Sequence, residues 1–283
     1  MTETRRGPRS AGDNDLWGPK DAARLIAVPT EDDDKYSRGV LGVITGSDQY
    51  PGAAVLGVEA ALRTGVGMVR YLGPSRASSL VLQRRPEAVT GNGRVQAWLI
   101  GSGMDHATRN EATHARINDA IAQALPTILD GGAFDLHSSS AGPTVITPHF
   151  RELARVLGTE VGDIAADPRT AARRAADELG VTVLLKGHTS YIASPDGTQL
   201  AASSATSWLA TAGSGDALGG ILGALVATHA GKLDSDPALL AQLAASASVI
   251  HGLAARRASA GGPFTILDLA AAVPATIAGL LAG

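Results

Sequence analysis

The sequence predicts an α/β protein in which a mostly parallel central sheet carries helices on both faces, giving three layers. Short β-branched, apolar segments alternate with longer segments whose apolar residues have helical spacing. The short segments are apolar throughout, as is typical of strands that are buried on both sides of a parallel sheet. Glycines and polar residues repeatedly follow them, at the sheet edge where such folds bind ligands.

In the first half of the chain, strand-like and helix-like segments follow one another in units. The strand expected at 40–46 is β-branched, and the helix at 52–64 follows a loop whose proline and glycine are helix-start signals. The segments at 68–72 and 75–83 repeat this strand–helix order. A strand, a helix and a strand are then expected at 97–100, 107–124 and 127–129.

The second half continues the alternation and then becomes helical. A strand is expected at 145–146, a helix at 169–179 and a strand at 181–185. The segment 191–201 contains Pro195-Asp196-Gly197, the strongest hairpin signal in the chain. Three apolar segments with helical character are expected at 217–230, 237–258 and 268–281.

Length and composition favour one large domain. The chain has 283 residues, of which 45% are hydrophobic, and no linker-like segment divides it. We expect a single domain at 32–283. The preceding segment, 1–31, is expected to form a partly disordered N-terminal extension, because its first residues are polar.

Composition and missing motifs exclude several functions. A net charge of −3 without basic blocks argues against nucleic acid as a partner. The absence of cysteine excludes disulfides and thiolate sites, and no histidines have the spacing of a protein-held metal site. Neither a P-loop nor a G-x-S-x-G nucleophile elbow occurs. Since we find no signal peptide or membrane-spanning run, we expect a cytoplasmic protein without a membrane partner.

The most informative motif is Gly213-Ser214-Gly215-Asp216, at the start of a predicted helix. Unpaired amides at the positive end of a helix bind anions, and Asp216 on the same turn can act as a base. Phosphoryl transfer from a nucleotide to a hydroxyl needs both groups. The alternative is an ordinary helix start that Ser214 or Asp216 caps. Three glycines in this helix lower its propensity by roughly 1 kcal/mol each and so favour close packing. They are Gly219, Gly220 and Gly223.

Two other strand ends carry candidate ligand-binding residues. His149 follows the strand at 145–146. In the alternative interpretation Thr147 caps the next helix, Pro148 takes its first position and His149 alone is unexplained. Lys186 follows the strand at 181–185, and a glycine and two hydroxyl residues lie close behind it. This lysine could contact phosphate or ribose, or it could be solvated.

A series of motifs runs through the chain in a fixed order. They are Gly46-Ser47-x-x-Tyr50-x-Gly52-Ala53, Ala60-Ala61-Leu62-Arg63-Thr64-Gly65-Val66-Gly67, Thr147-Pro148-His149-x-x-Glu152, Lys186-Gly187, Leu209-Ala210-Thr211-x-Gly213-Ser214-Gly215-Asp216 and His251-Gly252-Leu253-Ala254. In this order they resemble the ADP/ATP-dependent NAD(P)H-hydrate dehydratases, a branch of the ribokinase-like superfamily. The resemblance extends from about residue 32 to the end and implies a ribokinase-like fold.

The resemblance implies a hydro-lyase that repairs hydrated nicotinamide coenzymes. Such an enzyme converts the S epimer of NADHX or NADPHX to NADH or NADPH, with ADP (or ATP) as co-substrate, and ADP yields AMP and phosphate. The ring hydroxyl is phosphorylated and phosphate is then eliminated. Asp216 would take the hydroxyl proton, and the amides of Gly213, Ser214 and Gly215 would hold the developing charge. Mg²⁺ would offset the remaining phosphate charge.

The resemblance also implies binding residues and partners. Its hydrate site includes Ala53 or Ala54, Gly103, His149 and Asp216. Its nucleotide site includes Lys186, Gly187, His188, Thr189, Ser190 and Gly215. The resemblance also implies assembly into a homotetramer. Because 283 residues leave no room for the epimerase domain that many relatives carry, we expect a separate epimerase for the R epimer, or spontaneous epimerisation.

Three segments depart from the family pattern. Gly101-Ser102-Gly103-Met104-Asp105 replaces Gly-Pro-Gly-Leu-Gly, Asp130-Gly131-Gly132 replaces Asp-Ala-Asp, and Thr206-Ser207-Trp208 replaces Asn-Pro-Gly. We expect these changes to affect efficiency and nucleotide choice more than the class of reaction. Two alternatives remain: a small-molecule kinase that releases a stable phosphate ester, and a nucleotide-sensing protein without turnover.

Overall fold

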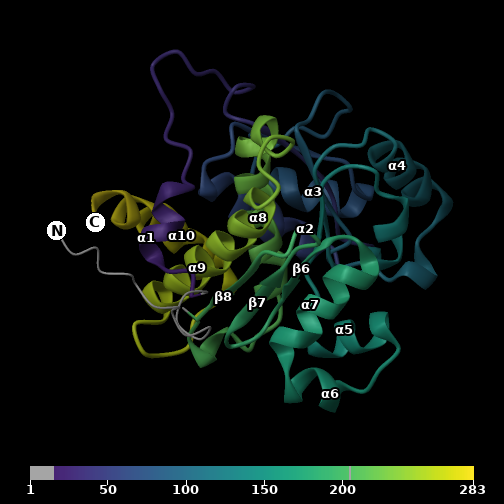
Figure 1. The fold of residues 1–283 in the computed structure, drawn as a ribbon. Coiled ribbons are helices and arrows are strands. Elements are labelled where there is room, and N and C mark those ends of the chain that lie inside the picture. Colours follow the sequence, from purple (N-terminus) through teal and green to yellow (C-terminus); the bar gives the residue numbers. More distant parts are fainter. Residues whose placement is uncertain (1–15, 204) are drawn as a thin grey trace.

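The computed structural model describes residues 16–203 and 205–283, and in these ranges one sheet of eight strands lies between two helical layers (Figure 1). β1 to β6 are parallel, and β7 and β8 extend the sheet as an antiparallel hairpin. The predicted α/β class with a mostly parallel sheet is confirmed. In order across the sheet, the strands are β2 (Met68–Tyr71), β1 (Val40–Ile44), β3 (Ala97–Ile100), β4 (Thr127–Leu129), β5 (Thr144–Ile146), β6 (Thr182–Leu185), β7 (Ser190–Ala193) and β8 (Gln199–Ala202).

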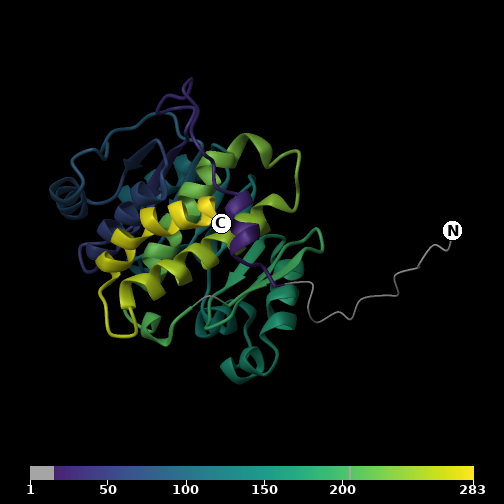
Figure 2. The same ribbon diagram turned by 90° about the vertical axis from the view of Figure 1, so that its left-hand side faces the viewer.

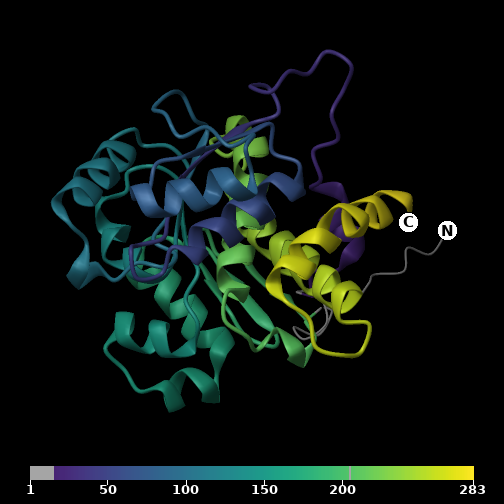
Figure 3. The same cartoon turned by 180° about the vertical axis from the view of Figure 1, so that it is seen from behind.

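The helices cover both faces of the sheet. One layer contains α2 (Gly52–Thr64), α3 (Ser75–Arg84), α8 (Ser214–His229), α9 (Leu239–Ser259) and α10 (Ile266–Ala282). The other contains α4 (Glu111–Ile121), α5 (Phe150–Leu157), α6 (Val161–Ala166) and α7 (Pro168–Leu179). Figure 2 shows α9 and α10 side by side in yellow, and Figure 3 shows the teal helices α4 to α7 on the far side from them.

Alternation along the strands distributes the core between these layers. In β1, Leu41 and Val43 pack with the first layer, whereas Val40 and Ile44 pack with the second. Every residue of β1 is buried, which is why the strand is apolar throughout rather than alternating in polarity. Gly197 has φ +97° in the turn between β7 and β8, so the expected hairpin is confirmed.

The segment expected to precede the domain is partly packed against it. The helix α1 (Pro19–Arg24), which the sequence analysis did not predict, contacts α9 and α10. Before it, the Trp17 indole Nε1 donates to Ser246 Oγ on α9 at 2.8 Å, and Leu16 bridges to Ala201 of β8. The disorder expected at the very start of the chain falls on residues 1–15, outside the described ranges.

Most of the expected helices and strands agree with the structure within two or three residues at each end. The helix expected at 107–124 is wrong at its start: α4 begins after Asn110, whose Oδ1 accepts from Thr113 N at 2.9 Å, and the short 3₁₀ helix His106–Thr108 precedes it. Like α1, α6 was not expected, and α5 was expected only in the alternative interpretation of Thr147 and Pro148. None of the helices in the described ranges has both the length and the apolar character that a bilayer crossing requires.

Candidate active site

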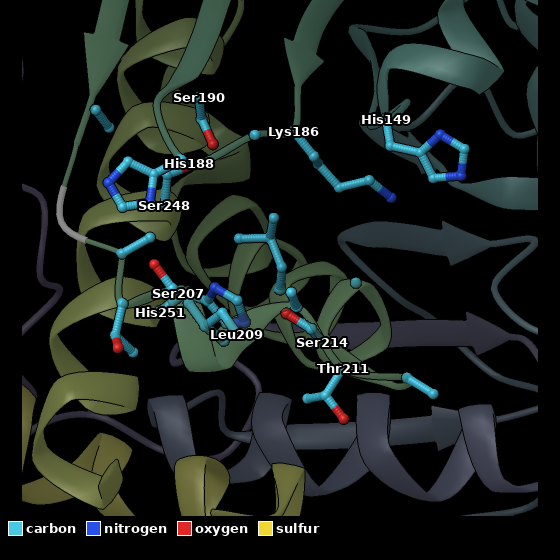
Figure 4. Close-up of a pocket in the computed structure, with 18 residues that line it drawn as sticks. His149, Lys186, His188, Ser190, Ser207, Leu209, Thr211, Ser214, Ser248 and His251 are labelled. Atoms are coloured by element: carbon cyan, nitrogen blue, oxygen red, sulfur yellow. The ribbon is translucent and has the colours of Figure 1, made fainter. Parts of the chain in front are cut away.

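A cavity of about 730 Å³ opens beyond the carboxyl ends of β5 and β6, beside the first turn of α8 (Figure 4). His149 follows β5 and Lys186 follows β6, and the parallel register brings them together as an isolated bridge. The loop from Ala205 to Ala212 and two side chains of α9 complete the lining. The sheet edge that the sequence predicted for ligand binding is therefore where the cavity lies.

The first turn of α8 is built for the close approach of an anion. Its N-cap residue, Gly213, has φ +89°, and a Cβ there would clash with Leu56 Cδ1, so only glycine fits. No side chain caps this helix, so the alternative in which Ser214 or Asp216 caps it is wrong. The first amides of a helix lack acceptors within the helix. Ser214 and Gly215 line the cavity at this point.

A buried ion pair lies opposite this turn. Lys186 Nζ donates to Asp130 Oδ1 at 2.9 Å, and Thr147 Oγ1 and Ser102 Oγ donate to the same carboxylate at 2.6 and 2.9 Å. Burial alone would raise the pKa of Asp130, but the charge of Lys186 and these hydrogen bonds hold it below its usual value. A Cβ on Gly215 would lie 3.3 Å from Lys186 Nζ, so the ammonium group sits against the start of α8.

Lys186 keeps its charge for a related reason. Burial alone would lower the pKa of this lysine, but the carboxylates of Asp130 and Glu152 raise it, and Asp216 adds to the effect. Glu152 Oε2 lies 3.9 Å from Lys186 Nζ. Ser214 N donates to Thr211 O at 3.4 Å, whereas Gly215 N has no acceptor among the described residues. The cavity therefore offers a fixed positive charge next to the start of a helix, a combination that suits a phosphate group.

Asp216 has the pKa of a general base. Burial and the charge of Asp130 raise the pKa of its carboxyl group, Lys186 opposes both, and together they bring it from 3.8 to about 7. At neutral pH the group is therefore divided between its acid and base forms. A carboxyl group in this state can accept a proton from a bound alcohol and release it again.

His149 has a structural role as well as a place at the cavity. It is the N-cap of α5: Glu152 N donates to His149 Nδ1 at 3.1 Å, and His149 N donates to Glu152 Oε2 at 2.8 Å. The interpretation that placed Thr147 at the cap and Pro148 in the first turn is therefore wrong. The Thr147 hydroxyl is bonded to Asp130 instead. Glu152 thus connects the cap of α5 with Lys186.

The predicted nucleotide residues largely come together. Gly187, His188 and Ser190 line the cavity with Lys186 and Gly215, whereas Thr189 is outside the lining and its Oγ1 donates to Ser203 Oγ at 3.2 Å. Figure 4 shows the side chain of Lys186 extending in the direction of His149.

Apart from His149, the predicted hydrate residues, Asp216 included, are not part of the lining of this cavity. Gly103 has φ +66°, and a Cβ there would clash with the Cβ of Ala53, so the loop after β3 is in contact with the start of α2. Ala53 is 7% exposed and Ala54 is fully buried, with its Cβ 3.1 Å from the place of a Cβ on Gly46. A second cavity of about 230 Å³, lined in part by Gly46 and Met104, adjoins the loop after β3.

Two of the departures from the family pattern have local explanations. Ser102 stands where the family pattern has proline, and its hydroxyl is one of the donors to Asp130. Gly132 follows Asp130 by two residues, and a Cβ there would clash with Met104 O, so a side chain could not be accommodated. Trp208 is 49% exposed beside the cavity, and nothing in the structure explains its presence.

The sequence analysis did not select four residues of the site. Asp130 appeared only in a departure from the family pattern, Glu152 appeared only in a motif, and Ser248 was not named. His251 appeared in a motif but received no role. Polar residues on an otherwise apolar segment, three positions apart, were the available signal for the last two.

The chain resembles known proteins over most of its length. A family model described as NAD(P)H-hydrate dehydratase matches residues 41–272. The chain is 43% identical over 220 residues to the bifunctional NAD(P)H-hydrate repair enzyme Nnr of Mycobacterium tuberculosis, covering 74% of this chain and 45% of the relative. It is 34% identical over 220 residues to the ADP-dependent (S)-NAD(P)H-hydrate dehydratase of Neisseria meningitidis serogroup B, covering 72% of this chain and 74% of the relative.

The fold also has solved counterparts. The ADP/ATP-dependent NAD(P)H-hydrate dehydratase from Bacillus subtilis, co-crystallised with ATP/Mg²⁺, superposes with a TM-score of 0.82 at 24% identity, covering 95% of this chain and all of that one. The expected ribokinase-like fold is confirmed. This chain spans about half the length of the bifunctional relatives. The match over residues 41–272, together with the identity to the Neisseria protein, establishes that the chain belongs to the NAD(P)H-hydrate dehydratase family.

Proposed function

We propose that this protein catalyses the ADP-dependent dehydration of the S epimer of NADHX or NADPHX, yielding NADH or NADPH, AMP and phosphate. The observation that carries the proposal is the position of Asp216, a carboxyl group with a pKa of about 7 on the first turn of α8. Lys186 stands against the same turn. Family membership gives the substrate class, because relatives are named for NAD(P)H-hydrate repair and for ADP dependence.

The first step is phosphorylation of the ring hydroxyl. Asp216 accepts the hydroxyl proton while the oxygen attacks the terminal phosphorus of ADP, and AMP leaves. The amides of Gly213, Ser214 and Gly215 hold the negative charge that develops on the transferred group. Lys186 adds a positive charge that its pair with Asp130 fixes in place.

The second step is elimination. Hydroxide is a poor leaving group, whereas phosphate leaves with the electrons of the C–O bond. The neighbouring ring carbon loses its proton to water, and the electrons of that C–H bond form the restored double bond. His149 and Glu152 lie close to Lys186 and could position the ring, together with Ala53 at the start of α2 and the loop that carries Gly103.

The residues present fit a Mg²⁺ that arrives on the nucleotide. In the part of the chain that the structure describes, no three histidine or carboxylate side chains form a metal-binding group. Mg²⁺ in phosphate sites needs only one or two carboxylates, with phosphate and water as its other ligands. Glu152 would be such a carboxylate, and the ion would supply positive charge to the phosphates.

We propose in addition that an epimerase supplies the S epimer, because several relatives are named bifunctional NAD(P)H-hydrate repair enzymes. The cytoplasmic location and the tetrameric assembly stay predictions of the sequence.

The test is to mix the purified protein with hydrated NADH, Mg²⁺ and ADP or ATP, and to follow reduced-nicotinamide absorbance and free phosphate together. Formation of NADH and release of phosphate in equal amounts support the proposal. A stable phosphate ester without recovered absorbance would instead identify the kinase, and nucleotide binding without phosphate release would identify the sensor. The Asp216→Asn variant should lose turnover and keep ADP binding. Equal loss of both would show that Asp216 is only structural.

A further inference from the structure

The cavity has a charged part and a largely neutral part. Lys186 and the first turn of α8 form the charged part, next to His149. Leu209, Leu218 and several alanines line much of the rest. Into this second part α9 contributes Ser248 and His251, which are three residues apart and therefore share a helix face.

His251 has unused hydrogen-bonding capacity at the cavity wall. The residue is 7% exposed, and its Nε2 atom is buried without a hydrogen-bond partner in the described part of the chain. A buried polar atom without a partner costs free energy, so such an atom calls for an explanation. Figure 4 shows the ring near Ser214, below Ser248, with Lys186 on the other side of the view.

The ring is neutral, which restricts what it can bind. Burial and the charge of Lys186 lower the pKa of His251, a hydrogen bond with the Ser214 backbone opposes them, and the resulting pKa is about 4. A neutral imidazole has one donor and one acceptor nitrogen, and the bond to the Ser214 backbone uses the donor, so Nε2 is left as an acceptor. A ribose hydroxyl or the amino group of a base can donate to it, whereas a phosphate has no proton to donate when ionised and gains more from the ammonium and the helix amides.

We propose that His251 is a specificity-determining residue that hydrogen-bonds the nucleoside part of the nucleotide, its ribose or base, and not its phosphates. The assignment rests on the proposed function in that ADP must bind this cavity. It predicts that the nucleoside and the phosphates of ADP depend on different residues: the nucleoside on His251 and the phosphates on Lys186.

The test compares ADP with pyrophosphate, which lacks the nucleoside, by isothermal titration calorimetry. His251→Phe keeps a ring of similar size and removes both nitrogens. We expect it to weaken ADP binding by roughly fivefold to tenfold, the effect of one lost hydrogen bond, and to leave pyrophosphate binding unchanged. His251→Gln, which keeps a donor and an acceptor, should recover part of the loss.

A matched control is His229→Phe, because His229 is equally buried at the far end of α8 and does not line the cavity. Its ADP affinity should equal that of the unmodified protein. Should His251→Phe not fold, as judged by circular dichroism, His251→Leu is measured in its place. Unchanged ADP affinity, or an equal loss for ADP and pyrophosphate, overturns the assignment. Failure of the unmodified protein to bind ADP overturns it too, but does so by removing the proposed function.

Discussion

Replacing Asp216 by asparagine should make the protein more stable near neutral pH while it removes the catalytic base. In the folded protein, burial and the charge of Asp130 raise the pKa of Asp216 from 3.8 to about 7. In the unfolded chain the same carboxyl group is surrounded by water and ionises near its usual value. Folding therefore carries a penalty whenever Asp216 must be ionised, and asparagine never ionises.

The pKa shift of Asp216 sets the size and the sign of the stability difference between the two proteins. At about 1.36 kcal/mol per pKa unit, a rise from 3.8 to about 7 corresponds to about 4 kcal/mol. The folded protein holds a proton between these two pH values that the unfolded chain has released, so the stability of the unmodified protein falls as pH rises through this window. The advantage of asparagine is therefore close to zero below about pH 4 and constant above about pH 7. The side-chain amide of the asparagine also needs hydrogen-bond partners in this buried position, so about 4 kcal/mol is an upper limit on the gain in stability.

The assay is urea unfolding of both proteins at several pH values from 4.5 to 8, followed by tryptophan fluorescence. Asp119→Asn, on the exposed face of α4, is the control and should stay within roughly 0.5 kcal/mol of the unmodified protein at every pH. A stability difference that does not change with pH, or an asparagine variant that is less stable at pH 8, would refute the reasoning about Asp216.

Three further predictions concern the same site. Lys186→Ala should lower the free energy of unfolding by about 3–5 kcal/mol, because it leaves the Asp130 carboxylate buried without its cation, and calorimetry should show a larger loss of affinity for ADP than for the hydrate. Gly213→Ala should lower the free energy of unfolding by roughly 1–3 kcal/mol, because φ is +89° and the new Cβ meets Leu56, with urea unfolding as the measurement. The rate of NADH recovery should rise about tenfold per pH unit below pH 7 and level off above it, as Asp216 loses its proton. A flat profile from pH 5 to 8 would contradict that role.

The fold could be predicted because the apolar pattern of each short segment is the one that a buried strand of a parallel sheet requires. Parallel strands buried on both faces are apolar throughout, and the chain marks their ends with glycine, proline and polar residues. The carboxyl ends of parallel strands meet at one edge, so the placement of His149 and Lys186 in one cavity followed from their positions after two predicted strands.

The electrostatics of the site could not be predicted in the same way. Asp130 and Lys186 are 56 residues apart, and only the order of β4, β5 and β6 in the sheet brings them together. The pKa of Asp216 depends on burial by distant segments and on the charge of Asp130. His251 faces the cavity because of how α9 is rotated, which its largely apolar sequence does not fix.

The glycines within α8 lower its helix propensity, but they let the helix pack closely and so fix its position beside Lys186. A Cβ on Gly220 would clash with Gly57 O of α2, and one on Gly223 would lie 2.8 Å from Leu41 Cδ2 of β1, so the expected close packing is confirmed. Each glycine lowers helix propensity by roughly 1 kcal/mol relative to alanine. Close packing against α2 and the sheet compensates for this loss and fixes the axis of α8. Gly215 is in the first turn of the same helix, next to Lys186, so a larger residue at Gly220 would disturb the position of the helix amides relative to the ammonium group without touching either.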